Sequence, residues 1–91
     1  MAQKRGKAET RDIVQRNETR VTFIDRERLN VRLTFERNVG QASFADHQEG
    51  AGAAILINAH DGEAPWFMVR ADVEELRDWL GGVLAATEVK R

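Results

Sequence analysis

The residues best suited to chemistry in this sequence are two histidines, each of which lies beside an acidic residue. His47 follows Asp46, and His60 precedes Asp61. Imidazole nitrogens combined with carboxylates are typical of metal sites and of acid–base catalysis. However, the apolar residues 53–59 between the histidines predict a strand, which at about 3.3 Å per residue would hold the two groups roughly 20 Å apart. We therefore expect no shared metal site.

Other catalytic signatures are lacking in the sequence. The chain contains no Cys, which excludes thiol nucleophiles, thiolate metal sites and disulfides. Ser43 lacks the glycine pattern of a nucleophile elbow. Residues 50–52 are glycine-rich but lead into a strand, whereas a phosphate-binding loop leads into a helix. These observations predict no catalytic residue, no metal and no cofactor, so the chain is not expected to be an enzyme.

The elements that could position a binding surface begin with a hairpin. Asp61-Gly62 is typical of a two-residue hairpin loop. Such a loop places Ile57 opposite Trp66 and Ile55 opposite Met68, and directly opposed residues share one face of a sheet. The second face carries four more apolar residues, Ala54, Leu56, Phe67 and Val69. Because both faces of this hairpin are apolar, we expect both to be covered.

A helix is predicted directly after the hairpin. Asp72 and Glu75 have the spacing of a capping box, and apolar residues follow at helical spacing, namely Val73, Leu76, Leu80, Val83 and Leu84. Each glycine of Gly81-Gly82 would cost about 1 kcal/mol relative to Ala inside a helix, but the apolar stripe continues beyond them. The helix would pack either against the chain's own sheet or against a symmetry mate. The predicted dimer contacts are Trp79, Gly81, Gly82 and Val83.

Two further strands are predicted in the first half of the chain, where apolar and polar residues alternate. If the loop between them contains an odd number of residues, such as Arg26–Arg28, Phe23 would lie opposite Val31 and Val21 opposite Leu33. One face of this hairpin would then be apolar. The expected fold is therefore α+β, with a four-stranded antiparallel sheet of two hairpins packed on one C-terminal amphipathic helix. Residues 1–17 are expected to be a flexible basic tail, and residues 18–91 a single domain.

Residues 38–52 form the best candidate for a binding loop. Glycines and Asn38 give this segment turn chemistry at both ends. Loops of about 15 residues are uncommon in compact domains unless they are functional or mobile. A mobile connector is the alternative interpretation. The residues predicted to bind a protein partner are those of the loop together with one hairpin residue: Phe44, Asp46, His47, Glu49 and Trp66.

A second set of residues could bind nucleic acid. Arginine suits phosphates and aromatic planes, and the candidates are Arg26, Arg28, Arg32 and Arg37. The order of strands and helix over residues 20–84, together with the stretch RLNVRLTFER (Arg28–Arg37), resembles the positive-cofactor-4-like and PUR-like single-stranded-DNA-binding modules. This resemblance implies a curved four-stranded sheet with a C-terminal helix, two copies that dimerise, and nucleic-acid contacts at those arginines. The sequence departs from the pattern in lacking a lysine-rich face.

Composition limits the remaining functions. Residues 1–37 hold ten basic and six acidic residues, and residues 38–91 hold four and nine, for a net charge of −1. No run approaches the roughly 18 apolar residues that cross a bilayer, so we expect a cytoplasmic protein without a membrane partner.

The expected function is a small non-catalytic interaction protein, a homodimer that binds an unidentified protein. Its composition is similar to phage or mobile-element proteins that bind and inhibit host factors. The alternative is a single-stranded nucleic-acid-binding dimer.

Overall fold

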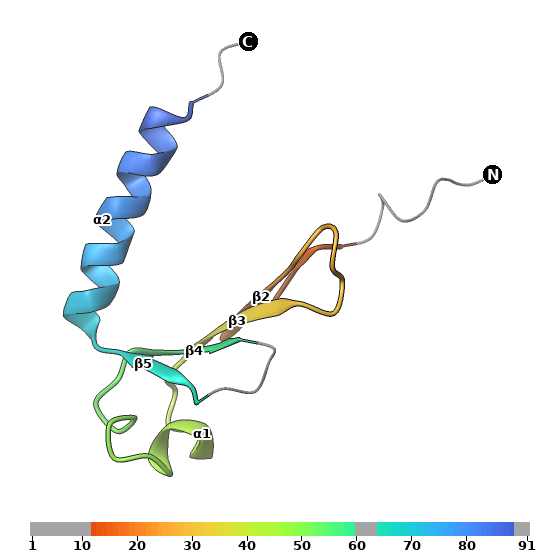
Figure 1. The fold of residues 1–91 in the computed structure, drawn as a ribbon. Helices are drawn as coiled ribbons and strands as arrows, with labels where there is room; N and C mark the ends of the chain where they lie inside the picture. The colour runs from red at the N-terminus through yellow and green to blue at the C-terminus, as the bar shows by residue number, and fades with distance from the viewer. Residues whose placement is uncertain (1–11, 60–63, 89–91) are drawn as a thin grey trace.

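The computed structural model describes residues 12–59 and 64–88, which form an α+β fold (Figure 1). Within these residues lies a five-stranded antiparallel sheet whose strands are adjacent in chain order, β1-β2-β3-β4-β5. The elements are β1 (Val14–Arg16), β2 (Arg20–Ile24), β3 (Arg32–Arg37), α1 (Ala42–Ala45), β4 (Ile55–Ala59), β5 (Trp66–Met68) and α2 (Arg70–Ala86). The predicted fold class, antiparallel sheet and C-terminal helix are confirmed.

The register of the later hairpin is the predicted one. Ile55 pairs with Met68, Leu56 with Phe67 and Ile57 with Trp66. The Asp61-Gly62 loop from which this register was inferred lies outside the described residues. Because opposed residues share a face, the division of the hairpin into two apolar faces is also confirmed.

The first hairpin differs from the prediction by two residues. Phe23 pairs with Leu33 and Val21 with Phe35, so each residue keeps its predicted face while the loop becomes longer. The reason lies in the turn, where Asp25 Oδ1 accepts hydrogen bonds from the backbone N–H groups of Glu27 (2.8 Å) and Arg28 (2.9 Å). This arrangement places residues 25–31 outside the strands.

The predicted four-stranded sheet is wrong, because residues 14–16 form a further strand in the segment expected to be a tail. Val14 pairs with Phe23 and Arg16 with Val21. The turn before β2 is built on Asn17, whose Oδ1 accepts hydrogen bonds from the backbone N–H groups of Thr19 and Arg20, both at 2.9 Å. Backbone pairing rather than burial therefore holds β1. The rest of the predicted tail, residues 1–11, lies outside the described residues.

The core lies on one face of β4 and β5. Leu56 and Phe67 are covered there by residues 38–54, which fold back and insert Phe44 of α1. Phe44 is 1% exposed and Leu56 2% exposed, and the rings of Phe44 and Phe67 meet edge to face with centroids 5.8 Å apart. The predicted loop is thus an ordered cover that contains a short helix.

Two polar side chains fix the start of the cover: Asn38 joins its two ends, and Gln41 fastens it to β3. Asn38 Nδ2 donates to the carbonyl oxygen of Ala53 (2.9 Å), and Asn38 Oδ1 accepts from the N–H of Gly40 (2.9 Å). Gln41 Nε2 donates to Glu36 Oε2 (3.1 Å) and to the carbonyl oxygen of Arg37 (3.0 Å). These bonds fix the direction in which the chain leaves β3.

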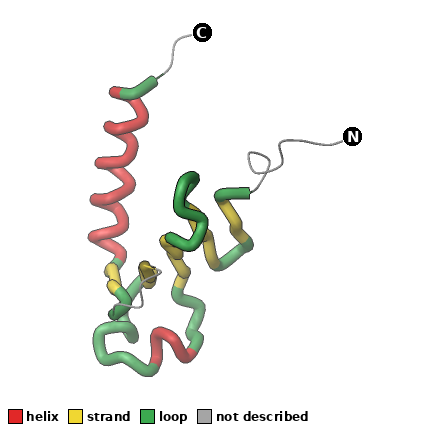
Figure 2. The backbone as a smooth tube through the Cα atoms, turned by 45° about the vertical axis from the view of Figure 1, so that its right-hand side comes forward, coloured by secondary structure: helices red, strands yellow, loops and turns green. Residues whose placement is uncertain are grey.

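The expected packing of α2 on the sheet is wrong, because the helix extends away from it (Figures 1 and 2). No residue of α2 is buried, and its main contact with another element is with β5 at its start. The helix begins at Arg70 with Val69 as N-cap, so Asp72 and Glu75 lie inside it and make no capping box. It runs through Gly81 and Gly82 to Ala86, as the continuing apolar stripe indicated.

Candidate interaction surface

Nine apolar side chains larger than alanine, from all five strands, share the face of the sheet opposite α1, where Ala59 also lies. We call this set the open face. It follows from the strand register and consists of Val14, Val21, Phe23, Leu33, Phe35, Ile55, Ile57, Trp66 and Met68. Phe23 and Phe35 meet edge to face with centroids 6.0 Å apart. Phe23 is nevertheless 45% exposed and Trp66 68% exposed. The open face is therefore an apolar surface that the described residues do not cover.

The open face is hollowed at one end, where basic side chains form its border. Arg16 pairs with Val21, and Arg37 pairs with Ile55, so both arginines belong to the same face as the apolar residues. Together with Phe35 they line a groove of about 430 Å³. Glu18 and Glu36 line the same groove, so a partner that fits this end would combine apolar groups with charged ones.

The helix presents a second apolar surface, which we call the α2 stripe. It consists of Val73, Leu76, Leu80 and Leu84, which line a shallow groove together with Arg77 and Gly81. Leu84 is 72% exposed. A neighbouring groove is lined by Trp66 and Met68 of β5 and by Leu76 and Trp79 of α2. This groove joins the open face to the α2 stripe, so the two surfaces are continuous.

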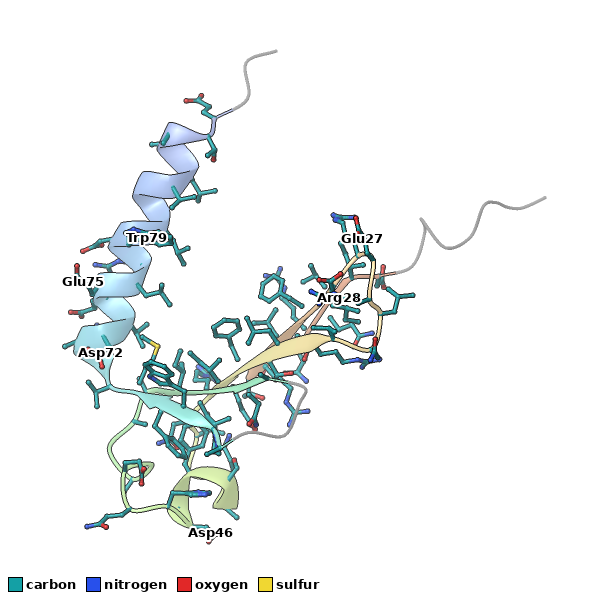
Figure 3. The ribbon with its side chains drawn as sticks, in the orientation of Figure 1. Glu27, Arg28, Asp46, Asp72, Glu75 and Trp79 are labelled. Atoms are coloured by element: carbon teal, nitrogen blue, oxygen red, sulfur yellow. The ribbon has the colours of Figure 1, made fainter. Side chains whose placement is uncertain are left out.

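The residues predicted to bind a protein partner fall on both sides of the sheet. Phe44 is in the core, so its assignment to a binding surface is wrong. Asp46, His47 and Glu49 are exposed on the covering segment, and the His47 ring lies 5.2 Å from the ring of Phe67. Trp66 lies on the open face. Figure 3 shows the separation, with Asp46 on one side of the sheet and Trp79 of α2 on the other.

The residues predicted at a dimer interface lie on α2. Trp79 is 65% exposed, and Gly81 and Gly82 are exposed as well. A Cβ atom placed on either glycine would meet no atom within 4 Å. Val83 is half-buried. All four residues are accessible to a second molecule.

The structure does not gather the four arginines proposed for nucleic-acid binding into one surface. Arg26 and Arg28 lie in the turn before β3, and Arg32 begins that strand. Arg37 ends the same strand, five residues later, and so faces the opposite side of the sheet. Arg28 also binds Asp25 within the turn, with Nη2 and Oδ2 3.0 Å apart.

The titration of the Asp25 carboxylate is strongly altered by its place in this turn. Its hydrogen bond from the Arg28 guanidinium, and then the bonds from the N–H groups of Glu27 and Arg28, lower the pKa of Asp25 from 3.8 to about 2. Hydrogen bonds to the charged form favour that form. The guanidinium of Arg28 is therefore engaged in holding the turn.

The described residues contain no group of three or more His, Asp or Glu side chains that could hold a metal ion. His60, Asp61 and Glu63, which entered the metal hypothesis, lie outside the described residues. The surface of the described residues can therefore bury apolar groups of a partner, and a few charged side chains border this surface.

Sequence reasoning missed the extent of the open face. Val14 belongs to it through β1, and the signal that could have revealed this is one apolar residue in phase with Phe23 across the Asn17 turn.

Comparisons with protein families, with curated proteins and with solved structures gave no match. None of the helices in the described part of the chain is long and apolar enough to cross a membrane.

Proposed function

We propose that this chain is a non-catalytic interaction module that associates with a second copy of itself through the open face and α2. The observation that carries the proposal is the continuous apolar surface formed by the five strands and the helix. Apolar patches of this extent on soluble proteins mark interaction sites. Burying a large apolar side chain that is otherwise exposed contributes about 1.5–3 kcal/mol, so several such residues offset a substantial cost of association.

The shape of the chain supports the same proposal. Its radius of gyration is 16.4 Å, whereas a compact domain of this length would have a radius of about 12 Å. The buried hydrophobic residues among those described are Ile24, Phe44, Ala53 and Leu56. A core this small stabilises an isolated chain weakly, and association would enlarge it.

A different protein partner would meet the opposite side of the sheet. Asp46, His47 and Glu49 are exposed on the covering segment, which lies across the sheet from the open face. They would remain accessible in a dimer formed through the open face. For the nucleic-acid alternative, Arg37 lies on a different face of the sheet from Arg32, so the four arginines would not form one binding surface.

The proposal is tested with charge substitutions on the two faces of the sheet. Leu33 lies on the open face and is 39% exposed, so Leu33→Asp should leave the chain folded while it places a charge in the interface. Sedimentation velocity at micromolar concentration should show a dimer for the unmodified chain and a monomer for Leu33→Asp. Gln15→Asp is the matched control, because Gln15 is exposed on the other face of β1. Equal dimerisation of all three proteins would refute the proposed surface.

A further inference from the structure

We infer that α2 of each copy lies across the open face of the other copy, so that each sheet is completed by its partner's helix. This inference rests on the proposed self-association and specifies what covers the open face. The alternatives are contact between the two helices and direct stacking of the two sheets. Four properties of the chain favour the exchanged helix.

The connection between β5 and α2 is too short to turn the helix back onto its own sheet. β5 ends at Met68 and α2 begins at Arg70, so Val69 is the only connecting residue. Its backbone is extended, with φ −79° and ψ 168°. Connections between strands and the helices that pack on them usually contain two to six residues. The helix therefore extends away from its own sheet, and the part of the stripe beyond Leu76, which shares a groove with Trp66 and Met68, is left for another molecule to cover.

The dimensions of the two surfaces match. The 17 residues of α2 give a helix about 25 Å long at 1.5 Å per residue. The outer strands of a five-stranded sheet are roughly 19 Å apart at about 4.8 Å per strand. One helix is thus long enough to cover the open face from β1 to β5.

The two surfaces are also chemically complementary. The α2 stripe is aliphatic, and Gly81 lies within it, so that large side chains of the open face have room to approach. Arg16 and Arg37 border the open face in a groove that Glu18 and Glu36 also line, and Asp72 and Glu75 of α2 line the groove beside Trp79. Opposite charges placed in this way favour one orientation of the helix on the sheet.

Symmetry makes the contact reciprocal, because in a twofold dimer each copy gives one helix and receives one. A helix about 10 Å wide and 25 Å long, counted on both surfaces of both contacts, buries on the order of 1,000 Å². That area reaches the lower range of specific protein interfaces. Exchange of the two helices therefore buries about as much surface as the smallest specific interfaces do.

The absence of Cys from the sequence allows a clean crosslinking experiment with full-length chains. Leu33→Cys places a thiol on the open face, and Leu80→Cys places one on the α2 stripe. Both sites are exposed in the single chain, Leu33 by 39% and Leu80 by 44%, so both variants should fold, as checked by circular dichroism. The two variants are unfolded in urea, mixed, refolded together and treated with a short bismaleimide, so that every mixed product joins different chains.

The exchanged helix predicts several-fold more covalent dimer in the mixture than in either variant alone. The control is a mixture of Gln15→Cys with Leu80→Cys, because the thiol of Gln15→Cys is on the face of the sheet opposite the open face. This mixture should give only the background amount of covalent dimer. If Leu80→Cys alone crosslinks best, the helices contact each other; if Leu33→Cys alone does, the sheets stack. Either result would overturn the exchanged-helix arrangement. It would leave the proposed self-association intact, because sedimentation would still detect a dimer. A chain that sediments as a monomer would instead refute the proposed function.

Discussion

Phe44 illustrates how the neighbours of a residue decide its role. An aromatic residue in a polar segment with turns at both ends is typical of a binding loop, which is the basis of its predicted role. The structure places it at 1% exposure between Leu56 and Phe67. Its burial depends on the fold of residues 38–54, and the sequence gives no direct signal for that long-range contact.

Gly50 is the residue that lets the covering segment close over the core. A Cβ atom at this position would lie 3.0 Å from Phe67 Cε1 and still closer to the backbone carbonyl oxygen of Phe44. Gly50→Ala should therefore lower the free energy of unfolding by about 1–3 kcal/mol, as overpacking does. Urea denaturation followed by circular dichroism measures this change.

Gly52 provides the control for that experiment, since a Cβ atom there would meet nothing within 4 Å. Gly52→Ala should change the stability by much less than Gly50→Ala. Equal effects of the two substitutions would show that the close contact at Gly50 is unimportant.

At the scale of elements, local patterns predicted the register of β4 with β5, and they favoured, without deciding it, the passage of α2 through its glycines. Those features depend on neighbouring residues, such as a two-residue turn or an apolar stripe. By contrast, β1 is held by backbone pairing with only Val14 on the open face, and the direction of α2 depends on the one-residue connection at Val69. Neither leaves a periodic pattern in the sequence.

The β2–β3 turn should be sensitive to pH through Asp25. Folding lowers the pKa of Asp25 from 3.8 to about 2. The charged carboxylate therefore stabilises the folded turn fully when the pH is above 3.8, and this stabilisation is lost as the pH falls through about 2. An NMR titration of the Asp25 carboxyl group should give the lowered pKa. Arg28→Ala should raise it, because Arg28 provides the largest contribution. A pKa of 3.8 in the unmodified chain would contradict this account of the turn.

The two glycines of α2 should respond differently to substitution. Ala is better than Gly inside a helix by about 1 kcal/mol, so Gly82→Ala should raise the thermal stability of the dimer. Gly81 lies in the α2 stripe, where a methyl group would push the helix away from its partner surface. Gly81→Ala should therefore weaken dimerisation in analytical ultracentrifugation. If Gly81→Ala raised the thermal stability of the dimer as much as Gly82→Ala, Gly81 would not be closely packed against the partner.

At the scale of the whole molecule, the chain is an elongated body of 50 × 31 × 23 Å with α1 and α2 on opposite sides of the sheet (Figure 1). The sequence indicated that both faces of the β4–β5 hairpin need a cover. The structure identifies residues 38–54 as the cover of one face and leaves the other face open. What a sequence cannot show is that α2, though apolar on one side, extends away from its own sheet.

Self-association of the unmodified chain can be measured as the molar mass in solution. Light scattering coupled to size-exclusion chromatography should give twice the chain mass of 10.3 kDa at micromolar concentration, with dissociation only on strong dilution. A folded species with the mass of a single chain across that range would show that the chain does not self-associate.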